Sequence, residues 1–153
     1  MSYNVGFDFD GVIHIDVTKH DNFGQRHPSI PFNHIPSNPF NKIINLIKLY
    51  YKYNCKIYII TARNSHSKDI IFDTLHKFNI NKYISKDNII TTGDTYNGSK
   101  IEMLEKLNIH DFYDDSIKIF NSIVNAKKNN KLKKLKNCYM SIPEKNKIIK
   151  LTI

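Results

Sequence analysis

Cysteine is scarce in this chain of 153 residues, which contains only Cys55 and Cys138. Neither residue belongs to a Cys-x-x-Cys pair or to a Cys/His spacing that binds metal. A disulfide framework and a zinc site built on cysteine are therefore not expected. The usage is typical of two reduced, buried thiols in a cytoplasmic protein.

Long apolar runs are also missing. No stretch reaches the roughly 18 apolar residues that a transmembrane helix needs, and the N-terminal sequence MSYNVGFDFDGV leads directly into a strand pattern. We expect neither a signal peptide nor a membrane span. The expected location is cytoplasmic. The length and a hydrophobic content of 41% predict one domain over residues 1–153 with its own core.

Arginine is the third scarcity. The chain has 23 Lys and Arg residues and a formal net charge of +9, yet only Arg26 and Arg63 are arginine. Lys, Asn and Ile are used heavily, which indicates an A+T-rich genome of viral or microbial origin. Part of the positive charge then reflects codon bias and not a nucleic-acid-binding surface, and each of the two arginines is a stronger candidate for a functional role.

Strand patterns alternate with helical periodicity along most of the chain. We expect strands at 4–9, 56–61, 88–92, 110–114 and 137–140, an edge strand at 147–153, and helices at 41–51, 67–78, 99–107 and 116–128. This alternation predicts an α/β fold: a single doubly wound, Rossmann-like parallel sheet with helices on both faces. Residues 14–39 are rich in His and Pro, lack helical rhythm and are expected to form an irregular insert.

The first predicted strand ends in Asp8-Phe9-Asp10-Gly11-Val12. Strand alternation would direct the Asp8 and Asp10 side chains to the same side, and Gly11 allows a sharp turn directly afterwards. Two carboxylates placed so close together repel each other unless a cation lies between them. An Asp-rich turn that only caps the strand is the simpler alternative.

A second acidic pair, Asp114 and Asp115, ends the strand predicted at 110–114. Because ligands of parallel sheets gather at the carboxyl ends of the strands, this pair should approach Asp8 and Asp10. Converging carboxylate oxygens suit Mg²⁺. The alternative is a helix N-cap supplied by Asp115 or Ser116.

Three further residues between the acidic pairs are suited to bind phosphate. The hydroxyl of Thr61 ends the strand at 56–61, and Arg63 offers a planar fork of N–H groups. Lys100 lies at the start of the helix predicted at 99–107, where a cation opposes the helix dipole. In a lysine-rich chain, Lys100 could equally be a surface residue.

The order of these motifs resembles the haloacid dehalogenase superfamily. Asp-x-Asp-Gly-Val, a hydrophobic strand ending in Thr, a Lys at a helix start, and a hydrophobic strand ending in Asp-Asp follow one another across residues 8–115. The resemblance implies a Mg²⁺-dependent phosphatase of the minimal-cap type, without a large cap domain.

The resemblance also implies a role for each motif residue. Asp8 would be the nucleophile that forms an aspartyl-phosphate, and Asp10 the general acid and base. Thr61 and Lys100 would bind the phosphoryl oxygens. The implied Mg²⁺ ligands are Asp8, Asp10 through its backbone carbonyl, and one or both of Asp114 and Asp115.

The expected substrate is a nucleic-acid end. Thr61-Ala62-Arg63, followed by Gly93-Asp94-Thr95 upstream of Lys100, is similar to the phosphatase domain of polynucleotide kinase–phosphatase, which removes 3′-phosphates. The expected substrate-binding residues are Gly11, Ala62, Arg63 and Arg26. A nucleotidase or a small-metabolite phosphatase is the alternative.

Two further features have more than one interpretation. Six lysines at 127–136 could bind a nucleic-acid backbone or form a solvated helix end. Histidines 14, 20, 27 and 34 could line the substrate entrance or be plain loop residues, and their spacing matches no usual zinc site. The alternative of another class is a non-catalytic nucleic-acid-binding module on the same fold.

Overall fold

The computed structural model describes residues 2–15, 35–93 and 97–153. The strands in these ranges form one sheet in the order β3-β2-β1-β4-β5-β6. They are β1 (Asn4–Phe7), β2 (Lys56–Thr61), β3 (Ile89–Thr91), β4 (Asp111–Asp114), β5 (Asn137–Ile142) and β6 (Lys147–Leu151). The helices are α1 (Asn41–Lys52), α2 (Lys68–Lys77), α3 (Asn97–Lys106) and α4 (Ile117–Lys128).

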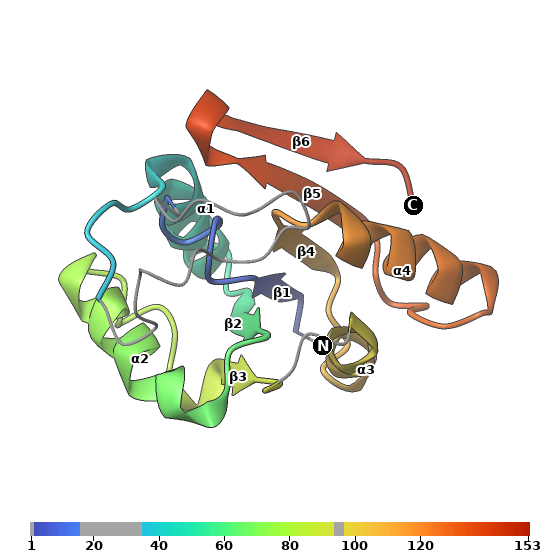
Figure 1. Cartoon of the computed structure of the whole chain (residues 1–153), viewed down its shortest axis with the longest axis horizontal. Coiled ribbons are helices and arrows are strands. Elements are labelled where there is room, and N and C mark those ends of the chain that lie inside the picture. Colours follow the sequence, from blue (N-terminus) through green and yellow to red (C-terminus); the bar gives the residue numbers. More distant parts are fainter. Residues whose placement is uncertain (1, 16–34, 94–96) are drawn as a thin grey trace.

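Helices cover both faces of the sheet. Figure 1 shows α1 and α2 on one side of the strands and α3 and α4 on the other. Each face has its own apolar cluster: Ile43, Ile47 and Leu75 belong to the first, and Leu104 and Ile123 to the second. The central strand β1 is buried along its whole length, as expected for a strand covered on both sides.

The predicted fold class is confirmed, with one addition. Strands β1 to β5 pair in parallel, whereas β6 pairs antiparallel with β5 at the edge of the sheet. A short 3₁₀ turn, Pro143–Lys145, and Asn146 with a positive φ of 51° connect these two strands. The connection is too short for a helical crossover, so the chain can only reverse direction.

The strand order also marks where a ligand would bind. From β1 the chain builds outward through β2 and β3, and it then returns to the other side of β1 to add β4, β5 and β6. In doubly wound sheets the crevice at such a reversal lies outside the carboxyl ends of the two central strands. Here those ends are Phe7 of β1 and Asp114 of β4, and the Asp8 amide donates to the Tyr113 carbonyl oxygen at 2.9 Å.

The four α-helices in the described part of the chain end in the same way. Each is followed, two residues after its last helical residue, by an asparagine with a positive φ: Asn54 (61°), Asn79 (59°), Asn108 (52°) and Asn130 (61°). After α1, the Asn54 amide donates to the Tyr51 carbonyl oxygen and the Cys55 amide to that of Tyr50, both at 3.0 Å. Equivalent pairs close the other three helices. These are Schellman motifs in which asparagine replaces the more usual glycine.

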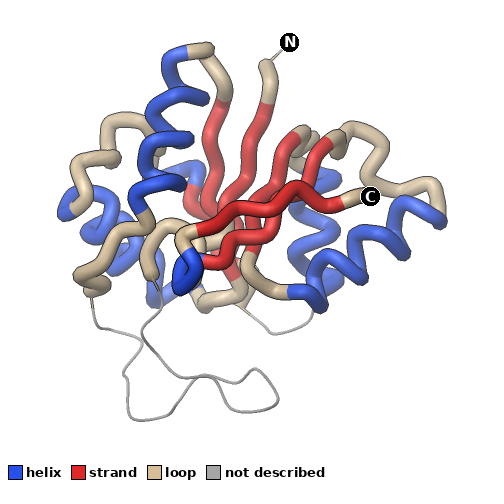
Figure 2. The backbone as a smooth tube through the Cα atoms, turned by 90° about the horizontal axis from the view of Figure 1, so that it is seen from above, coloured by secondary structure: helices blue, strands red, loops and turns tan. Residues whose placement is uncertain are grey.

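Part of the predicted insert lies outside the described residues. Residues 16–34 include Arg26, His20, His27 and His34, and residues 94–96 include Asp94 and Thr95. The two ends of the insert are described: the Ile15 amide donates to the Asn38 carbonyl oxygen at 2.7 Å, and His14 forms a β-bridge with Pro39. Figure 2 shows the sheet from above, with helices on either side of the strands.

No helix within residues 2–15, 35–93 and 97–153 is long and apolar enough to cross a bilayer.

Candidate active site

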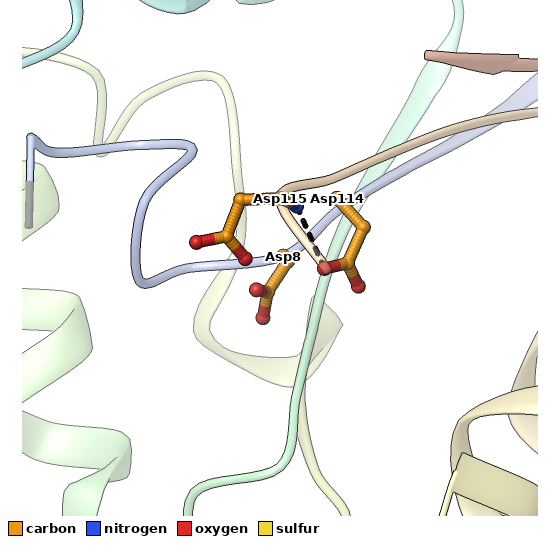
Figure 3. A group of neighbouring side chains, drawn as sticks. All are labelled: Asp8, Asp114 and Asp115. Atoms are coloured by element: carbon orange, nitrogen blue, oxygen red, sulfur yellow. Dashed lines mark hydrogen bonds between the residues drawn. The ribbon is translucent and has the colours of Figure 1, made fainter. Parts of the chain in front are cut away.

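Three aspartates meet at the carboxyl ends of the two central strands. Asp8 follows β1, Asp114 ends β4 and Asp115 comes next, and one carboxylate oxygen from each lies within 4.8 Å of the others. Figure 3 shows the three side chains side by side. Two stretches that are about a hundred residues apart in the chain are therefore brought together, as the sequence patterns predicted.

Lys100 neutralises part of this negative charge. Its Nζ lies 2.8 Å from Asp114 Oδ2 and 3.1 Å from Asp8 Oδ1, and the residue is 8% exposed. Burial disfavours the ammonium, but the Asp114 and Asp8 carboxylates outweigh it and raise the pKa of Lys100 above its usual value. With all three aspartates ionised, the cluster still carries an excess of two negative charges.

The remaining charge shows in the ionisation of the carboxyls. Burial, followed by the charge of Asp114, raises the pKa of Asp8, and Lys100 only partly offsets this rise. Crowding by protein atoms, followed by the charges of Asp8 and Asp114, raises the pKa of Asp115 although the residue as a whole is exposed. A divalent cation would relieve this repulsion.

The two aspartates of the second pair differ in what their oxygens contact. Asp114 is fully buried, and its Oδ1 accepts hydrogen bonds from the backbone amides of Asp115 (2.7 Å) and Ser116 (3.0 Å), while Oδ2 accepts from Lys100. Asp114 therefore orders the turn that leads into α4, whereas Ser116, the N-cap residue, makes no side-chain cap. Asp115 faces solvent and is better placed to bind an ion directly.

Gly11 lies directly against Asp115. Its φ is +75°, and a Cβ added at this position would come 2.1 Å from Asp115 Oδ2. Glycine is needed both for the turn and for the close approach of the carboxylate. The predicted role of Gly11 in turning the chain fits this geometry, and the acidic neighbour is an additional constraint.

Thr61 and Ala62 lie at the end of β2, the strand next to β1. Thr61 is 1% exposed, and its Oγ1 accepts a hydrogen bond from the Arg63 backbone amide at 3.3 Å. Ala62 is exposed. Both therefore lie at the same sheet edge as the three aspartates.

Asp10 forms an ion pair with Arg63. Arg63 Nε donates to Asp10 Oδ2 at 2.8 Å and Nη2 donates to Oδ1 at 2.7 Å, which is a bidentate ion pair. Regular strand structure ends at Phe7, so alternation no longer controls the Asp10 side chain. Among the described residues, the metal-suited carboxylate group consists of Asp8, Asp114 and Asp115 without Asp10.

His14, which was expected either to line the substrate entrance or to be a plain loop residue, contacts Asp10. Its Nε2 lies 2.9 Å from Asp10 Oδ1, and the residue is 5% exposed. The sequence offers one signal for this contact, the four-residue separation from Asp10. In a segment without helical periodicity that signal carries little weight.

The lysine run lies near the amino ends of the strands, opposite the end of the sheet that carries the aspartates. It begins at the end of α4, and the Lys136 amide donates to the carbonyl oxygen of His110, which directly precedes β4. The 12-residue helix α4 spans roughly 18 Å, which separates most of the run from the aspartates. Five lysines of the run are exposed: Lys128, Lys131, Lys133, Lys134 and Lys136.

No protein-family model matches the sequence. An uncharacterized protein of Acanthamoeba polyphaga mimivirus is 41% identical over 147 residues, which cover 94% of this chain. The chain spans 28% of the length of that relative.

Solved structures show what fold the chain shares. A haloacid dehalogenase superfamily hydrolase from Ehrlichia chaffeensis gives a TM-score of 0.51 at 19% identity, over 82% of this chain and 85% of that one. The 3-deoxy-D-manno-octulosonate 8-phosphate phosphatase of Moraxella catarrhalis, solved with magnesium, phosphate and KDO, gives 0.44 at 16% identity, over 80% of this chain and 62% of the other. On the first of these likenesses and on its own strand order, the chain has the fold of the haloacid dehalogenase superfamily.

Proposed function

We propose that this protein is a Mg²⁺-dependent phosphomonoester hydrolase that works through an aspartyl-phosphate on Asp8. The observation that carries the proposal is the cluster of Asp8, Asp114 and Asp115 facing Lys100 at the carboxyl edge of the sheet. A buried carboxylate beside an ammonium and an uncompensated acidic pair is costly for a structural role alone. It suits a site that receives a dication and a phosphate.

In the first step an Asp8 carboxylate oxygen attacks phosphorus, and the bond from phosphorus to the leaving oxygen breaks. Asp10, in its acid form, gives its proton to that leaving oxygen. Lys100 lies 3.1 Å from Asp8 and reduces the repulsion between the nucleophile and the anionic substrate. Because Asp10 is ion-paired with Arg63 in this structure, that pair has to open before Asp10 can act.

In the second step water attacks phosphorus and the bond from phosphorus to Asp8 breaks. Asp10, now a carboxylate, takes the proton from the water, which yields inorganic phosphate and the original enzyme. Thr61 and Arg63, at the end of β2, are assigned to the phosphoryl oxygens. Their N–H and O–H groups would stabilise the equatorial charge during both displacements.

The residues fit a magnesium ion. Asp8, Asp115 and the backbone carbonyl of Asp10 would hold it. Asp114 would contribute its charge without direct coordination, since both of its oxygens already accept hydrogen bonds. When bound, Mg²⁺ supplies positive charge that offsets the repulsion between the Asp8 carboxylate and the phosphate.

The test is Mg²⁺-dependent release of phosphate from para-nitrophenyl phosphate. We expect wild-type activity that EDTA abolishes, and a loss of about 10³-fold or more in Asp8→Asn, which removes the nucleophile. Asp73→Asn, a matched change on the exposed side of α2, should retain full activity. Equal, very slow rates for wild type and Asp8→Asn would reject the enzyme and favour a non-catalytic binding module.

For the substrate we propose a phosphorylated nucleic-acid end. Support comes from Thr61-Ala62-Arg63 at the end of β2 and from the exposed lysines of residues 127–136. The rival is a nucleotidase or a small-metabolite phosphatase. Comparing kcat/KM for 3′-phosphorylated oligonucleotides, mononucleotides and a phosphoprotein decides between them, and a preference for free mononucleotides contradicts the proposal.

A further inference from the structure

The carboxylate of Asp10 is held from two sides. Arg63 contacts both of its oxygens, and His14 contacts Oδ1 through Nε2 at 2.9 Å. Both partners also lie on the ring of Phe9, with the Arg63 Cζ 5.1 Å and the His14 ring 4.9 Å from its centroid. Asp10, His14 and Arg63 therefore form one packed unit beside the carboxylate cluster.

Arg63 has two possible uses for the same N–H groups. The Nε and Nη2 edge that grips Asp10 is an edge with which a guanidinium binds phosphate bidentately. In the proposed reaction Arg63 binds phosphoryl oxygens, so an arriving substrate competes with Asp10 for this edge. Once Arg63 binds the substrate, Asp10 loses its bidentate partner just before it has to donate a proton to the leaving oxygen.

His14 is fixed independently of Arg63. Its backbone bridges both Asp10 and Pro39, and its Nδ1 lies 3.2 Å from the Ile15 carbonyl oxygen. With the ring 5% exposed and packed on Phe9, His14 has little freedom to follow Arg63. Its contact with Asp10 Oδ1 can therefore persist when Arg63 moves.

The chemistry of the two partners differs in a useful way. A guanidinium only donates hydrogen bonds, so Arg63 holds a carboxylate but offers nothing to the hydroxyl of a carboxylic acid. An imidazole nitrogen can either donate or accept. Nε2 can therefore accept from the Asp10 hydroxyl when Asp10 is an acid and, when Nε2 itself carries a proton, donate to the Asp10 carboxylate.

We infer that His14 is a positioning residue for Asp10: it keeps one Asp10 oxygen in place while Arg63 leaves that carboxylate for the phosphoryl group of the substrate. The inference rests on the proposed phosphatase function and adds a residue to it. His14 itself does not touch the reacting atoms in this scheme.

The test compares two phosphate esters that need a proton donor to different extents. Para-nitrophenolate is a good leaving group, whereas an alkoxide leaves only with protonation. We expect His14→Ala to lower kcat/KM for an alkyl phosphate by about tenfold or more, with kcat/KM for para-nitrophenyl phosphate changed much less, since this ratio reports the step in which the leaving group departs. His14→Gln, whose amide can donate to or accept from Asp10, should recover most of the alkyl phosphate rate.

His76→Ala is the matched control, because His76 is an exposed histidine in the last turn of α2. It should leave both esters unaffected. A crystal structure of wild type with Mg²⁺ and inorganic phosphate provides a second readout: Asp10 should retain His14 while Arg63 contacts the phosphate.

The outcomes separate the two claims. A wild type that hydrolyses neither ester rejects the proposed function, and the inference falls with it. An active wild type rejects the inference alone if His14→Ala lowers kcat/KM equally for both esters or for neither. Retention of the Asp10–Arg63 pair in the phosphate complex also rejects it.

Discussion

Lys100 is the buried cation of a site that has more negative than positive charge. Its ammonium contacts Asp114, which is 0% exposed, and Asp8, which is 7% exposed. Replacing Lys100 by Met removes the cation that contacts those carboxylates in a region where water cannot solvate them. We expect the free energy of unfolding at pH 8 without Mg²⁺ to fall by about 3–5 kcal/mol.

Urea unfolding measures this loss. Lys106→Met is the control, because Lys106 is an exposed lysine at the opposite end of α3, and it should unfold close to wild type. A Lys100→Met protein as stable as wild type would show that the ammonium does not neutralise the cluster.

Replacing Gly11 by Ala tests whether the position of Asp115 matters for metal binding. An alanine Cβ would come 2.1 Å from Asp115 Oδ2, so the carboxylate has to move. Gly93 is the matched control, since it also has a positive φ, +80°, but an added Cβ meets nothing within 4 Å among the described residues. Gly93→Ala therefore reports backbone strain alone, roughly 1 kcal/mol.

We expect Gly11→Ala to lose most of the thermal stabilisation that Mg²⁺ gives to wild type, while Gly93→Ala keeps it. Thermal unfolding with and without MgCl₂ provides the measurement. The same Mg²⁺ response in both variants would remove Asp115 from the set of direct ligands.

The acidic cluster also predicts how the metal-free protein responds to pH. Burial and neighbouring charge raise the pKa values of Asp8 and Asp115 in the folded state above the ordinary value near 3.9. The folded protein then binds protons more readily than the unfolded chain, so this contribution to stability is lost as pH rises from about 4 through neutrality.

Urea unfolding in EDTA at several pH values checks this sign. Since Asp115→Asn removes one of the repelling charges, its stability advantage over wild type should grow with pH, and Mg²⁺ should reduce it. An advantage that shrinks as pH rises would contradict the assignment.

At the scale of elements, the four helix ends share one device that can be tested as a set. Asn54, Asn79, Asn108 and Asn130 occupy left-handed backbone positions that most L-residues avoid. Each Asn→Ala change should cost about 1 kcal/mol, whereas each Asn→Gly change should be neutral or slightly stabilising.

Thermal unfolding of the four single variants of each type measures the effect. Asn125→Ala, in the middle of α4, is the control because its backbone is helical. Equal costs for alanine and glycine at a helix end would assign the effect to the asparagine side chain instead of the backbone.

The elements themselves could be predicted because their patterns are local. Apolar runs and helical periodicity predicted the six strands and four α-helices of the described ranges, with boundaries that differ from those observed by a few residues. The rule that functional residues follow parallel strands also brought Asp8 and Asp114 together. The direction of β6 was not predicted, because it depends on a short turn whose geometry is set by Asn146.

The side-chain pairing of Asp10 could not be predicted in the same way. Strand alternation placed Asp10 beside Asp8, but β1 ends at Phe7 and the following turn redirects the side chain. Arg63 was expected to bind substrate phosphate, and the choice between phosphate and carboxylate depends on a contact across 53 positions in the chain. Sequence spacing does not determine such a choice.

At the scale of the whole molecule, the lysine run lies near the amino ends of the strands and the aspartate cluster lies at their carboxyl ends. If the run binds a nucleic-acid backbone, only an oligonucleotide long enough to pass along α4 can contact both. We expect replacement of Lys131, Lys133 and Lys134 by Ala to raise KM for long 3′-phosphorylated oligonucleotides and to weaken its salt dependence. Activity toward short oligonucleotides and para-nitrophenyl phosphate should not change.

Steady-state kinetics over a series of oligonucleotide lengths and salt concentrations measures this. Identical KM values for the triple variant and wild type at every length would indicate that the lysines form only a solvated helix end.

The repeated asparagine ends have a consequence for how this protein can be changed. Because every helix starts near the strand ends that carry the aspartates and finishes at the far rim, all four Schellman turns lie away from the proposed chemistry. Resistance to heat and catalytic rate should therefore be separately adjustable here. Substitutions at the four asparagines could therefore raise thermal stability without any change to the aspartate cluster.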